Sequence, residues 1–331
     1  MSDFSVVICT YNGETLLPQV LEKLRSQKPR CTWEVVIVDN NSQDRTAAVV
    51  AELQRRWRPD VPLRYCFEPE QGLAFARRRA IREVCSPLIG FLDDDTLPDP
   101  NWVSAAVHFA QQHPEAGAYG GNIEGIYEIA PPPNFSRIAC CLAVINRGDQ
   151  PFQYSAARGV LPAGAGMVIR RQAWLTQVPA EPALAGVKAG SLKAKGEDVE
   201  TLTYIRQSWA IWHNPAMKLR HIIPKERLNR DYLLNLFWQI GLSRYSLRRI
   251  QYRQWQWPLV MPLYFLNDLK KACWYLSTKL LTRQFETVEA CELSLLLGSL
   301  LSPFLHRQRI LVIEPLLNAV SLPTRIVQDL L

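Results

Sequence analysis

Three adjacent carboxylates, Asp93, Asp94 and Asp95, directly follow the short apolar run 87–92. Turn residues bound this run, which is typical of a buried strand. Carboxylates that crowd at the tip of a buried strand repel one another, and no basic residue lies nearby in the sequence to hold them. The cluster therefore predicts a binding site for a cation from outside the chain. A solvated acidic turn, with 99–101 as the cap of a following helix, is the alternative.

Alternating strand and helix patterns predict the elements that position this cluster. The expected strands span 4–9, 34–38, 63–67 and 87–92, and the expected helices span 16–25, 46–56, 73–84 and 101–112. Such alternation is typical of βαβ units, so we expect an α/β fold with a mostly parallel sheet. In open parallel sheets, ligands bind at the carboxyl ends of the strands.

Polar clusters follow three of the expected strands at these ends. They are Thr10-Tyr11-Asn12-Gly13, Asp39-Asn40-Asn41-Ser42 and the acidic cluster 93–95. We therefore expect the three clusters to converge on one ligand site. The alternation stops near residue 125, and the chain beyond Pro224 has helical patterns that are basic and aromatic. This change predicts an α/β domain over 1–224 and a helical region over 225–331.

The composition is that of a folded globular protein: 48% of the 331 residues are hydrophobic and 21% are charged. The eight cysteines show no Cys-x-x-Cys pair and no metal-ligand spacing. Because the N-terminus lacks a signal-peptide pattern, we expect reduced thiols in a cytoplasmic protein. No run of 18 uncharged apolar residues occurs, so a membrane-spanning helix is not expected.

Five segments together resemble the family 2 glycosyltransferases, in that family's order: 6–14, 36–46, 91–95, 163–171 and 196–200. The resemblance covers residues 4 to about 222. It implies a GT-A fold, a nucleotide-diphosphate-sugar donor, a divalent metal and inversion at the anomeric carbon. More specifically, the chain resembles bacterial exopolysaccharide enzymes, including a cyanobacterial hormogonium-polysaccharide type.

The resemblance assigns metal and diphosphate roles to the acidic cluster. Asp95 matches the second Asp of the family's Asp-x-Asp motif and is the first choice for the metal ligand. Asp93 is expected near the ribose or the metal, and Asp94 on the donor side. Mn²⁺ or Mg²⁺ would use one or two carboxylates together with phosphates and water. His221 stands where some relatives use a histidine near the metal or diphosphate, although a lone histidine is more often structural.

Nucleotide contacts are expected from the other strand ends. Asp39 resembles the family's base- or ribose-binding aspartate, and an Asx turn is its alternative or additional role. Three further residues are expected beside the nucleotide: Thr10, Tyr11 and Asn12. Tyr11 has capping of the core as an alternative. Arg77, in a segment resembling the family's Gly-x-x-x-Ala-Arg-Asn, is expected to pair with the diphosphate, although Arg78 replaces the usual Asn.

The acceptor side is assigned by the same resemblance. Asp198 matches the base that takes the proton of the acceptor hydroxyl, and the charges of Glu197 and Glu200 would help to raise its pKa. A helix start, where acidic residues are favoured by the helix dipole, is the alternative. Gly164 and Gly166 predict a turn of close backbone approach beside the acceptor.

The segment 225–283 has eleven Lys and Arg against three acidic residues, a net charge of +8, with four tryptophans and five tyrosines. No nucleic-acid-binding motif is present, so no nucleic acid is expected. Interfacial helices combine cations and Trp in this way, which favours contact with an anionic membrane surface. A helical subdomain packed on the core, with Trp238, Trp255, Trp257 and Trp274 partly inside, is the alternative.

These observations predict a metal-dependent inverting glycosyltransferase in cell-surface polysaccharide synthesis. It would move a sugar from a nucleotide-diphosphate donor, with a UDP-sugar favoured, to a saccharide or lipid-linked acceptor. A nucleotidyltransferase would need a basic residue in the loop 10–14, which has none. A non-catalytic nucleotide-sugar-binding protein would be expected to lose the carboxylates, yet all are present: Asp39, Asp93, Asp95 and Asp198.

Overall fold

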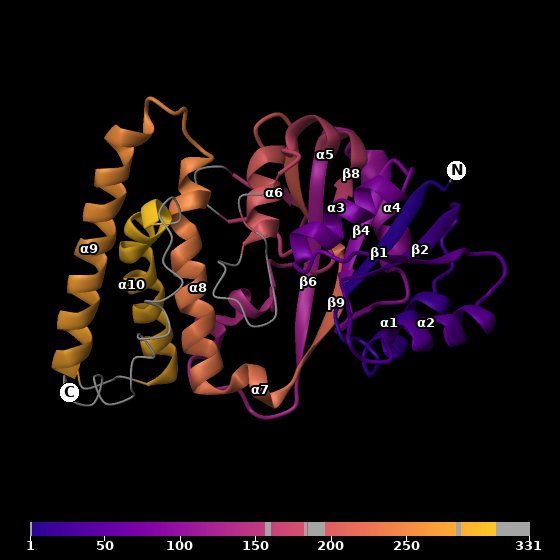
Figure 1. Cartoon of the computed structure of the whole chain (residues 1–331), viewed down its shortest axis with the longest axis horizontal. Helices are drawn as coiled ribbons and strands as arrows, with labels where there is room; N and C mark the ends of the chain where they lie inside the picture. The colour runs from indigo at the N-terminus through magenta and orange to yellow at the C-terminus, as the bar shows by residue number, and fades with distance from the viewer. Residues whose placement is uncertain (1, 156–159, 182–183, 185–195, 283–285, 309–331) are drawn as a thin grey trace.

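The computed structural model describes residues 2–155, 160–181, 184, 196–282 and 286–308. Its centre is a mixed nine-stranded sheet with the strand order β3-β2-β1-β4-β8-β6-β9-β5, and β7 pairs with β9 at the side (Figure 1). The strands are β1 (Phe4–Thr10), β2 (Trp33–Asp39), β3 (Leu63–Phe67), β4 (Leu88–Asp93), β5 (Thr96–Pro98), β6 (Ala116–Tyr127), β7 (Phe152–Gln153), β8 (Val168–Arg170) and β9 (Ala210–Ile223).

The first four strands are parallel, as the sequence predicted. Helices α1 (Leu17–Arg25), α2 (Thr46–Arg55), α3 (Leu73–Glu83) and α4 (Trp102–Gln112) also lie where they were expected. Every residue of β1 and β2 is buried, as is typical of parallel strands covered on both faces. Side chains alternate between the two faces of β1, with Phe4, Val6 and Ile8 in one hydrophobic core and Val7 and Cys9 in the other.

The second half of the chain completes the sheet with strands that the sequence did not predict. β6 and β9 pair in parallel along most of their length, and β8 is antiparallel to both β4 and β6. Gly residues interrupt β6 and Pro215 interrupts β9, and both residue types are depleted in strands. Tertiary pairing therefore overrides local propensity here.

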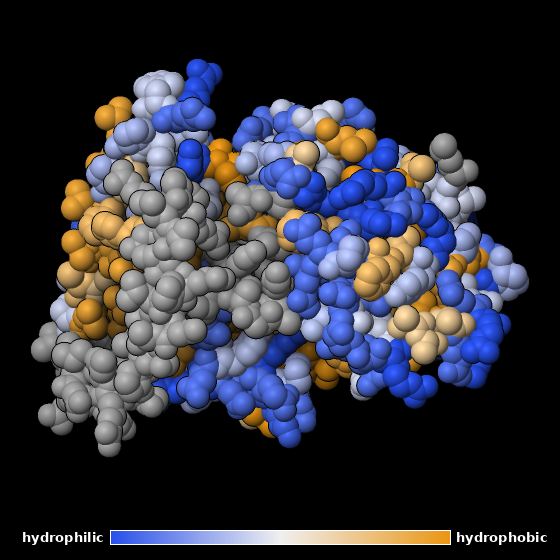
Figure 2. Space-filling view, viewed as in Figure 1, coloured by the Kyte–Doolittle hydropathy of each residue, from blue (hydrophilic) through white to orange (hydrophobic). Residues whose placement is uncertain are grey.

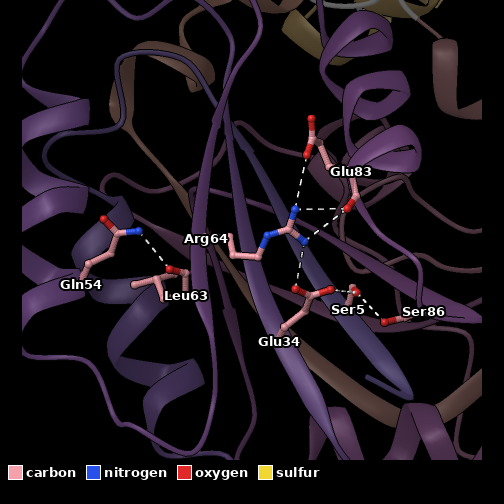
Figure 3. Close-up of polar contacts among 7 residues, drawn as sticks. All are labelled: Ser5, Glu34, Gln54, Leu63, Arg64, Glu83 and Ser86. Carbon is pink, nitrogen blue, oxygen red and sulfur yellow. Dashed lines mark hydrogen bonds and ion pairs between the residues drawn. The ribbon is translucent and has the colours of Figure 1, made fainter. Parts of the chain in front are cut away.

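A polar network ties the strands together at the end of the sheet away from the acidic cluster (Figure 3). Arg64 of β3 donates to the Glu34 carboxylate of β2 at 3.1 Å and to the backbone oxygen of Glu83 at 3.2 Å. Ser5 of β1 donates to Glu34 at 2.7 Å and is 2.7 Å from the Ser86 hydroxyl. Because Glu34 is buried, these partners offset the cost of removing its charge from water.

The C-terminal region is helical, as predicted. Its elements are α7 (Lys225–Leu228), α8 (Arg230–Arg249), α9 (Trp257–Thr282) and α10 (Thr287–Gln308), after α5 (Arg171–Gln177) and α6 (Glu197–Ile205) in the sheet domain. In Figure 1, α8, α9 and α10 stand together at the left of the sheet. Leu233 and Phe237 of α8 share a hydrophobic core with Phe135, Leu142 and Ile223 of the preceding chain. The division at 224/225 stays a prediction, since this core joins its two sides.

Candidate active site

The polar clusters after β1, β2 and β4 converge at one edge of the sheet because these strands are parallel and in register. Thr10 pairs with Asp39, and Cys9 pairs with Asp93. A cavity of about 690 Å³ lies at this edge. Eight of the predicted site residues line it: Thr10, Tyr11, Asp93, Asp94, Asp95, Glu197, Asp198 and His221.

The acidic cluster lies in the tight turn between β4 and β5. The Thr96 hydroxyl closes this turn by accepting from the Asp93 N–H at 3.1 Å and donating to the Asp93 carbonyl at 2.8 Å. Thr10 donates its hydroxyl to Asp94 Oδ2 at 2.5 Å. Burial, with the neighbouring charge of Asp95, nevertheless raises the pKa of Asp94 to about 7. Thr10 is thus held by the cluster itself.

Asp95 is the most buried of the three carboxylates, with 3% of its surface exposed. Its Oδ2 lies 2.8 Å from Arg227 Nη1 and 3.3 Å from His221 Nε2. Burial acts to raise the pKa of Asp95, but His221 and Arg227 outweigh it and the pKa lies below its usual value. Burial and the charge of Asp95 instead raise the pKa of Asp93.

Arg227 corrects the expectation that only a cation from outside the chain would hold this cluster. It lies in α7, far from the cluster in sequence but next to it in space. The sequence analysis counted Arg227 only as part of the basic C-terminal segment. The signal available in the sequence was that Arg227 follows His221 by only six residues, with the end of β9 between them.

His221 is oriented toward the cavity by its neighbours. Its partner across the strand pair β5–β9 is Thr96, which brings it beside Asp95. Its Nδ1 lies 2.9 Å from the Leu142 carbonyl, so Nδ1 carries the proton and donates it there. Its Nε2 faces Arg227 Nη1 at 3.2 Å and Asp95 Oδ2 at 3.3 Å, so in the neutral imidazole this nitrogen can accept from the guanidinium.

The residues around Asp95 fit a divalent ion only in part. Among the described residues, no three His, Cys, Asp or Glu side chains form a metal-binding group. Asp95 and His221 provide two adjacent acceptors, and the buried Asp95 Oδ1 has no hydrogen-bond partner among the described residues. Mg²⁺ and similar ions commonly take one or two protein ligands and complete their shell with phosphates and water. The pair therefore suits an ion that arrives with a phosphorylated ligand.

Asp198 lies in the first turn of α6 and lines the same cavity. Its Oδ2 accepts from the Gly164 N–H at 2.9 Å, and its Oδ1 accepts from the Val199 N–H at 2.8 Å. A Cβ at position 164 would stand 2.9 Å from the Asp198 Cβ. Glycine at this position therefore allows the backbone to approach and hold the Asp198 carboxylate.

Glu197 and Arg77 form a buried ion pair behind Asp198, with Arg77 Nη1 3.3 Å from Glu197 Oε1. Burial and the charge of Asp198 raise the pKa of Glu197, while Arg77 opposes this shift. The sequence predicted that Arg77 would bind the diphosphate. Instead it pairs with Glu197 and is not among the residues that line the cavity.

Besides Arg77, four predicted site residues lie outside the cavity lining. Asp39 accepts from the Ser42 N–H at 2.9 Å and from the Tyr65 hydroxyl at 2.7 Å, so the Asx-turn role is present. Asn12, with a φ of 57°, joins the loops after β1 and β2 through Ser42. Gly164 contacts Asp198 as described. Gly166 has a φ of +73°, and a Cβ there would lie 2.0 Å from Leu219, so local backbone and packing explain this glycine.

Two segments that the sequence did not link to the site form part of the cavity wall. One is the 3₁₀ turn η2 (Ala139–Leu142), and the other is a face of α8. The α8 residues are spaced by three or four positions: Tyr232, Leu236, Ile240, Ser243 and Leu247. The sequence predicted a helical region here, but only the packing of α8 shows that this face borders the cavity.

Comparison with known families agrees with this architecture. The family model described as glycosyl transferase family 2 matches residues 5–173, just over half of the chain. The chain belongs to glycosyl transferase family 2. This family 2 glycosyltransferase therefore contains the strand ends and the acidic cluster within the matched region, whereas Asp198, His221 and Arg227 follow it.

Two archaeal relatives from Haloferax volcanii match part of this glycosyltransferase. One is a glucosyl-dolichyl phosphate glucuronosyltransferase, 26% identical over 36% of this chain and 37% of its own length. The other is the glycosyltransferase AglE, 30% identical over 37% of this chain and 40% of its own length. The matches thus span less than half of each relative.

Solved structures show the same fold. The mannosyltransferase PcManGT from Pyrobaculum calidifontis, in complex with GDP-Man and Mn²⁺, has a TM-score of 0.60 and 16% identity, covering 92% of this chain and 87% of its own. GalNAc-T7 with UDP, GalNAc and Mn²⁺ has a TM-score of 0.50 and 16% identity, covering 73% and 48%. This chain therefore has a GT-A fold, followed by a helical C-terminal region.

Proposed function

We propose that this enzyme transfers a sugar from a nucleotide-diphosphate donor, with inversion, to a hydroxyl of a saccharide or lipid-linked acceptor. The observation that carries the proposal is that Asp95, His221 and Asp198 line one cavity. The process would be cell-surface polysaccharide synthesis on the cytoplasmic side of the membrane. The Mn²⁺ and nucleotides in the two neighbouring structures support a metal and a nucleotide-sugar donor.

The donor would lie along the strand ends. Asp95 and His221 would hold Mn²⁺ or Mg²⁺, which when bound stabilises the charge of the departing diphosphate as a Lewis acid. Asp93 and Asp94 extend the same acidic turn toward the ribose and donor side. Tyr11, 38% exposed at the cavity, is free to stack on or border the nucleotide rather than cap the core.

Arg227 adds a cation that the diphosphate can use. Its guanidinium already lies beside the two proposed metal ligands, and guanidinium groups bind phosphate oxygens strongly. Arg227 thereby takes the role that the sequence assigned to Arg77. Arg77 instead supports Glu197 and, through it, the start of α6.

Asp198 would accept the proton of the acceptor hydroxyl as that oxygen attacks the anomeric carbon. The N–H of Gly164 fixes the direction of its carboxylate, which a positioned base requires. The buried Glu197, paired with Arg77, stands next to it at the start of α6.

The acceptor would meet a wall that is largely apolar. Leu236, Ile240 and Leu247 of α8 line the cavity. This wall supports an acceptor with an apolar portion and favours the lipid-linked class. The dolichyl-phosphate substrate named for one archaeal relative is of that class.

Asp198→Asn tests the proposal because it keeps the size of the side chain and removes the base. We expect nucleotide affinity to stay unchanged while transfer falls by about 10²-fold or more. The assay is donor hydrolysis and transfer with the full chain and Mn²⁺, screened across UDP-, GDP- and dTDP-sugars. Asp231→Asn, at the exposed start of α8, is the matched control. Wild-type transfer by Asp198→Asn would reject the assignment.

A further inference from the structure

The outer face of α9 exposes a row of large apolar side chains. The exposed fractions are 68% for Leu259, 66% for Leu263, 59% for Leu266 and 72% for Trp274. These positions share one helical face, and the row extends for about 22 Å at 1.5 Å per residue. Figure 2 shows hydrophobic residues in orange along the left edge of the molecule, where α9 lies. We call this row the α9 stripe.

A second apolar row on α10 adjoins the α9 stripe. Four α10 residues at helical spacing are between 37% and 57% exposed: Leu297, Leu301, Phe304 and Leu305. The Phe304 ring lies 6.1 Å from the Phe265 ring of α9, edge to face, so the α10 row borders α9 at this point. Exposed apolar patches formed by several large side chains mark interaction surfaces.

Among the described side chains of α9, the exposed charges are positive and the acidic side chain is buried. Lys270 and Lys271 are exposed, whereas the carboxylate Asp268 is 1% exposed and paired with Arg248 at 2.6 Å. On α10, both Glu289 and Glu292 are ion-paired with Arg137. Among the described residues of 257–305, Glu286, just before α10, is the exposed acidic residue. The face formed by the two rows is therefore apolar and positive.

We propose that the outer face of α9 and α10 lies in the plane of an anionic lipid bilayer. Apolar side chains would enter the boundary between headgroups and acyl chains, and the two lysines would meet anionic headgroups. Trp274 at one end and Trp255, 66% exposed, at the other are side-chain types that favour the headgroup level. No part of this argument uses the catalytic residues, so its failure would leave the proposed transfer reaction intact.

The structure narrows the membrane contact that the sequence placed over 225–283. Trp257, one of the four tryptophans of that segment, is 8% exposed and donates its Nε1–H to the Tyr245 hydroxyl at 3.1 Å. Arg227 and Arg248 are committed to Asp95 and Asp268. These cations and this ring stabilise the fold and do not reach lipid.

α10 would lie on the bilayer and not cross it. By length and composition, Thr287–Leu305 is one helix among the described residues that could span a membrane. However, a Cβ on Gly241 of α8 would stand 2.9 Å from Gly298 Cα, and Ser299 donates to Asp268 at 2.6 Å. Spanning would have to separate these contacts and the ion pairs to Arg137, and unpaired charges in hydrocarbon are costly.

Vesicle co-sedimentation of the full chain tests the proposal, with phosphatidylcholine vesicles that contain or lack phosphatidylglycerol. We expect binding to the anionic vesicles that weakens as salt rises. Lys270→Glu with Lys271→Glu should reduce binding by about 25-fold or more, since each lysine contributes roughly fivefold. Lys23→Glu with Lys28→Glu, exposed on and after α1, is the matched control and should change little.

The apolar row is tested separately by replacing Leu259, Leu263 and Leu266 together with Gln. We expect the triple variant to bind vesicles at least tenfold more weakly than wild type, both at low and at high salt. Its Tm should be unchanged, because all three side chains are exposed. Leu175→Gln, 52% exposed on α5, is the control. Wild-type binding by the triple variant, or no preference for anionic vesicles, would overturn the proposal. The proposal would also be overturned if the wild-type protein were a dimer and the triple variant a monomer. It would equally be overturned if the protein stayed in cell membranes during an alkaline carbonate wash.

Discussion

Replacing Arg227 by Gln should make Mn²⁺ bind more tightly when no nucleotide is present. Arg227 Nη1 lies 2.8 Å from Asp95 Oδ2 and 3.2 Å from His221 Nε2, the two atoms proposed as metal ligands. A divalent ion and the guanidinium therefore compete for the same pair of acceptors. Glutamine removes the competing charge and leaves a shorter, uncharged polar side chain.

The expected magnitude follows from the geometry of the ion pair. Opposite charges at 4 Å attract by about 4 kcal/mol at an effective dielectric constant of 20. The Arg227 side chain is 38% exposed, so solvent screens much of this attraction. A net value of about 1.5 kcal/mol, typical of a hydrogen bond to a charged group, corresponds to about tenfold tighter Mn²⁺ binding.

The same substitution should have the opposite effect on nucleotide. With Mn²⁺ saturating, Arg227→Gln should bind a nucleoside diphosphate more weakly, because the displaced guanidinium no longer contacts the phosphate oxygens. Mn²⁺ titration followed by electron paramagnetic resonance, and calorimetry with UDP or GDP, measure the two affinities. Lys225→Gln, exposed on the same short helix, is the control. Unchanged or weaker Mn²⁺ binding by Arg227→Gln would refute the competition.

Three further outcomes are expected. Asp268→Asn should lower the free energy of unfolding by about 3 kcal/mol in urea titrations, because Arg248 loses a buried partner. Burial acts to raise the pKa of Asp268, but the hydrogen bond from Arg248 outweighs it, and the pKa is lowered. The stability that this ion pair contributes is therefore present above the ordinary pKa of 3.8 and is lost as the pH falls through the lowered pKa of the folded state. Gly164→Ala should reduce transfer more than nucleotide affinity, since the new Cβ would stand 2.9 Å from Asp198 Oδ2. Separate measurements should show a lower kcat with little change in KM, whereas equal effects on both would mean that the glycine only shapes the fold. UDP or GDP should raise the Tm only when Mn²⁺ or Mg²⁺ is present, and equal stabilisation in excess chelator would remove the metal from the donor site.

Local sequence patterns were sufficient for the parallel half of the sheet. The strands that end at Thr10, Asp39 and Asp93 are short apolar runs bounded by turn residues, and the helices between them have apolar residues at helical spacing. Because parallel strands end at a common edge, the convergence of their polar clusters followed from topology alone. The hydrophobic periodicity of each strand and helix, and the turn residues that bound it, lie within a few residues of that element in the sequence.

Tertiary structure decided which side chains meet at the site. β6 and β9 pair with each other although they lie far apart in the chain, and the pairing of β9 with β5 places His221 beside Asp95. Arg227 reaches the same carboxylate from α7, whereas Arg77 turns away to Glu197.

The direction of the C-terminal side chains was decided in the same way. Composition showed that the segment is basic and aromatic, yet only packing separates the buried Trp257 from the exposed Trp255 and Trp274. Each of these outcomes depends on contacts between residues far apart in the chain. A charged or aromatic residue has the same local sequence pattern whether its side chain faces a distant partner or solvent. The sequence alone therefore determines which charged and aromatic residues are present, and the fold determines which of them pair.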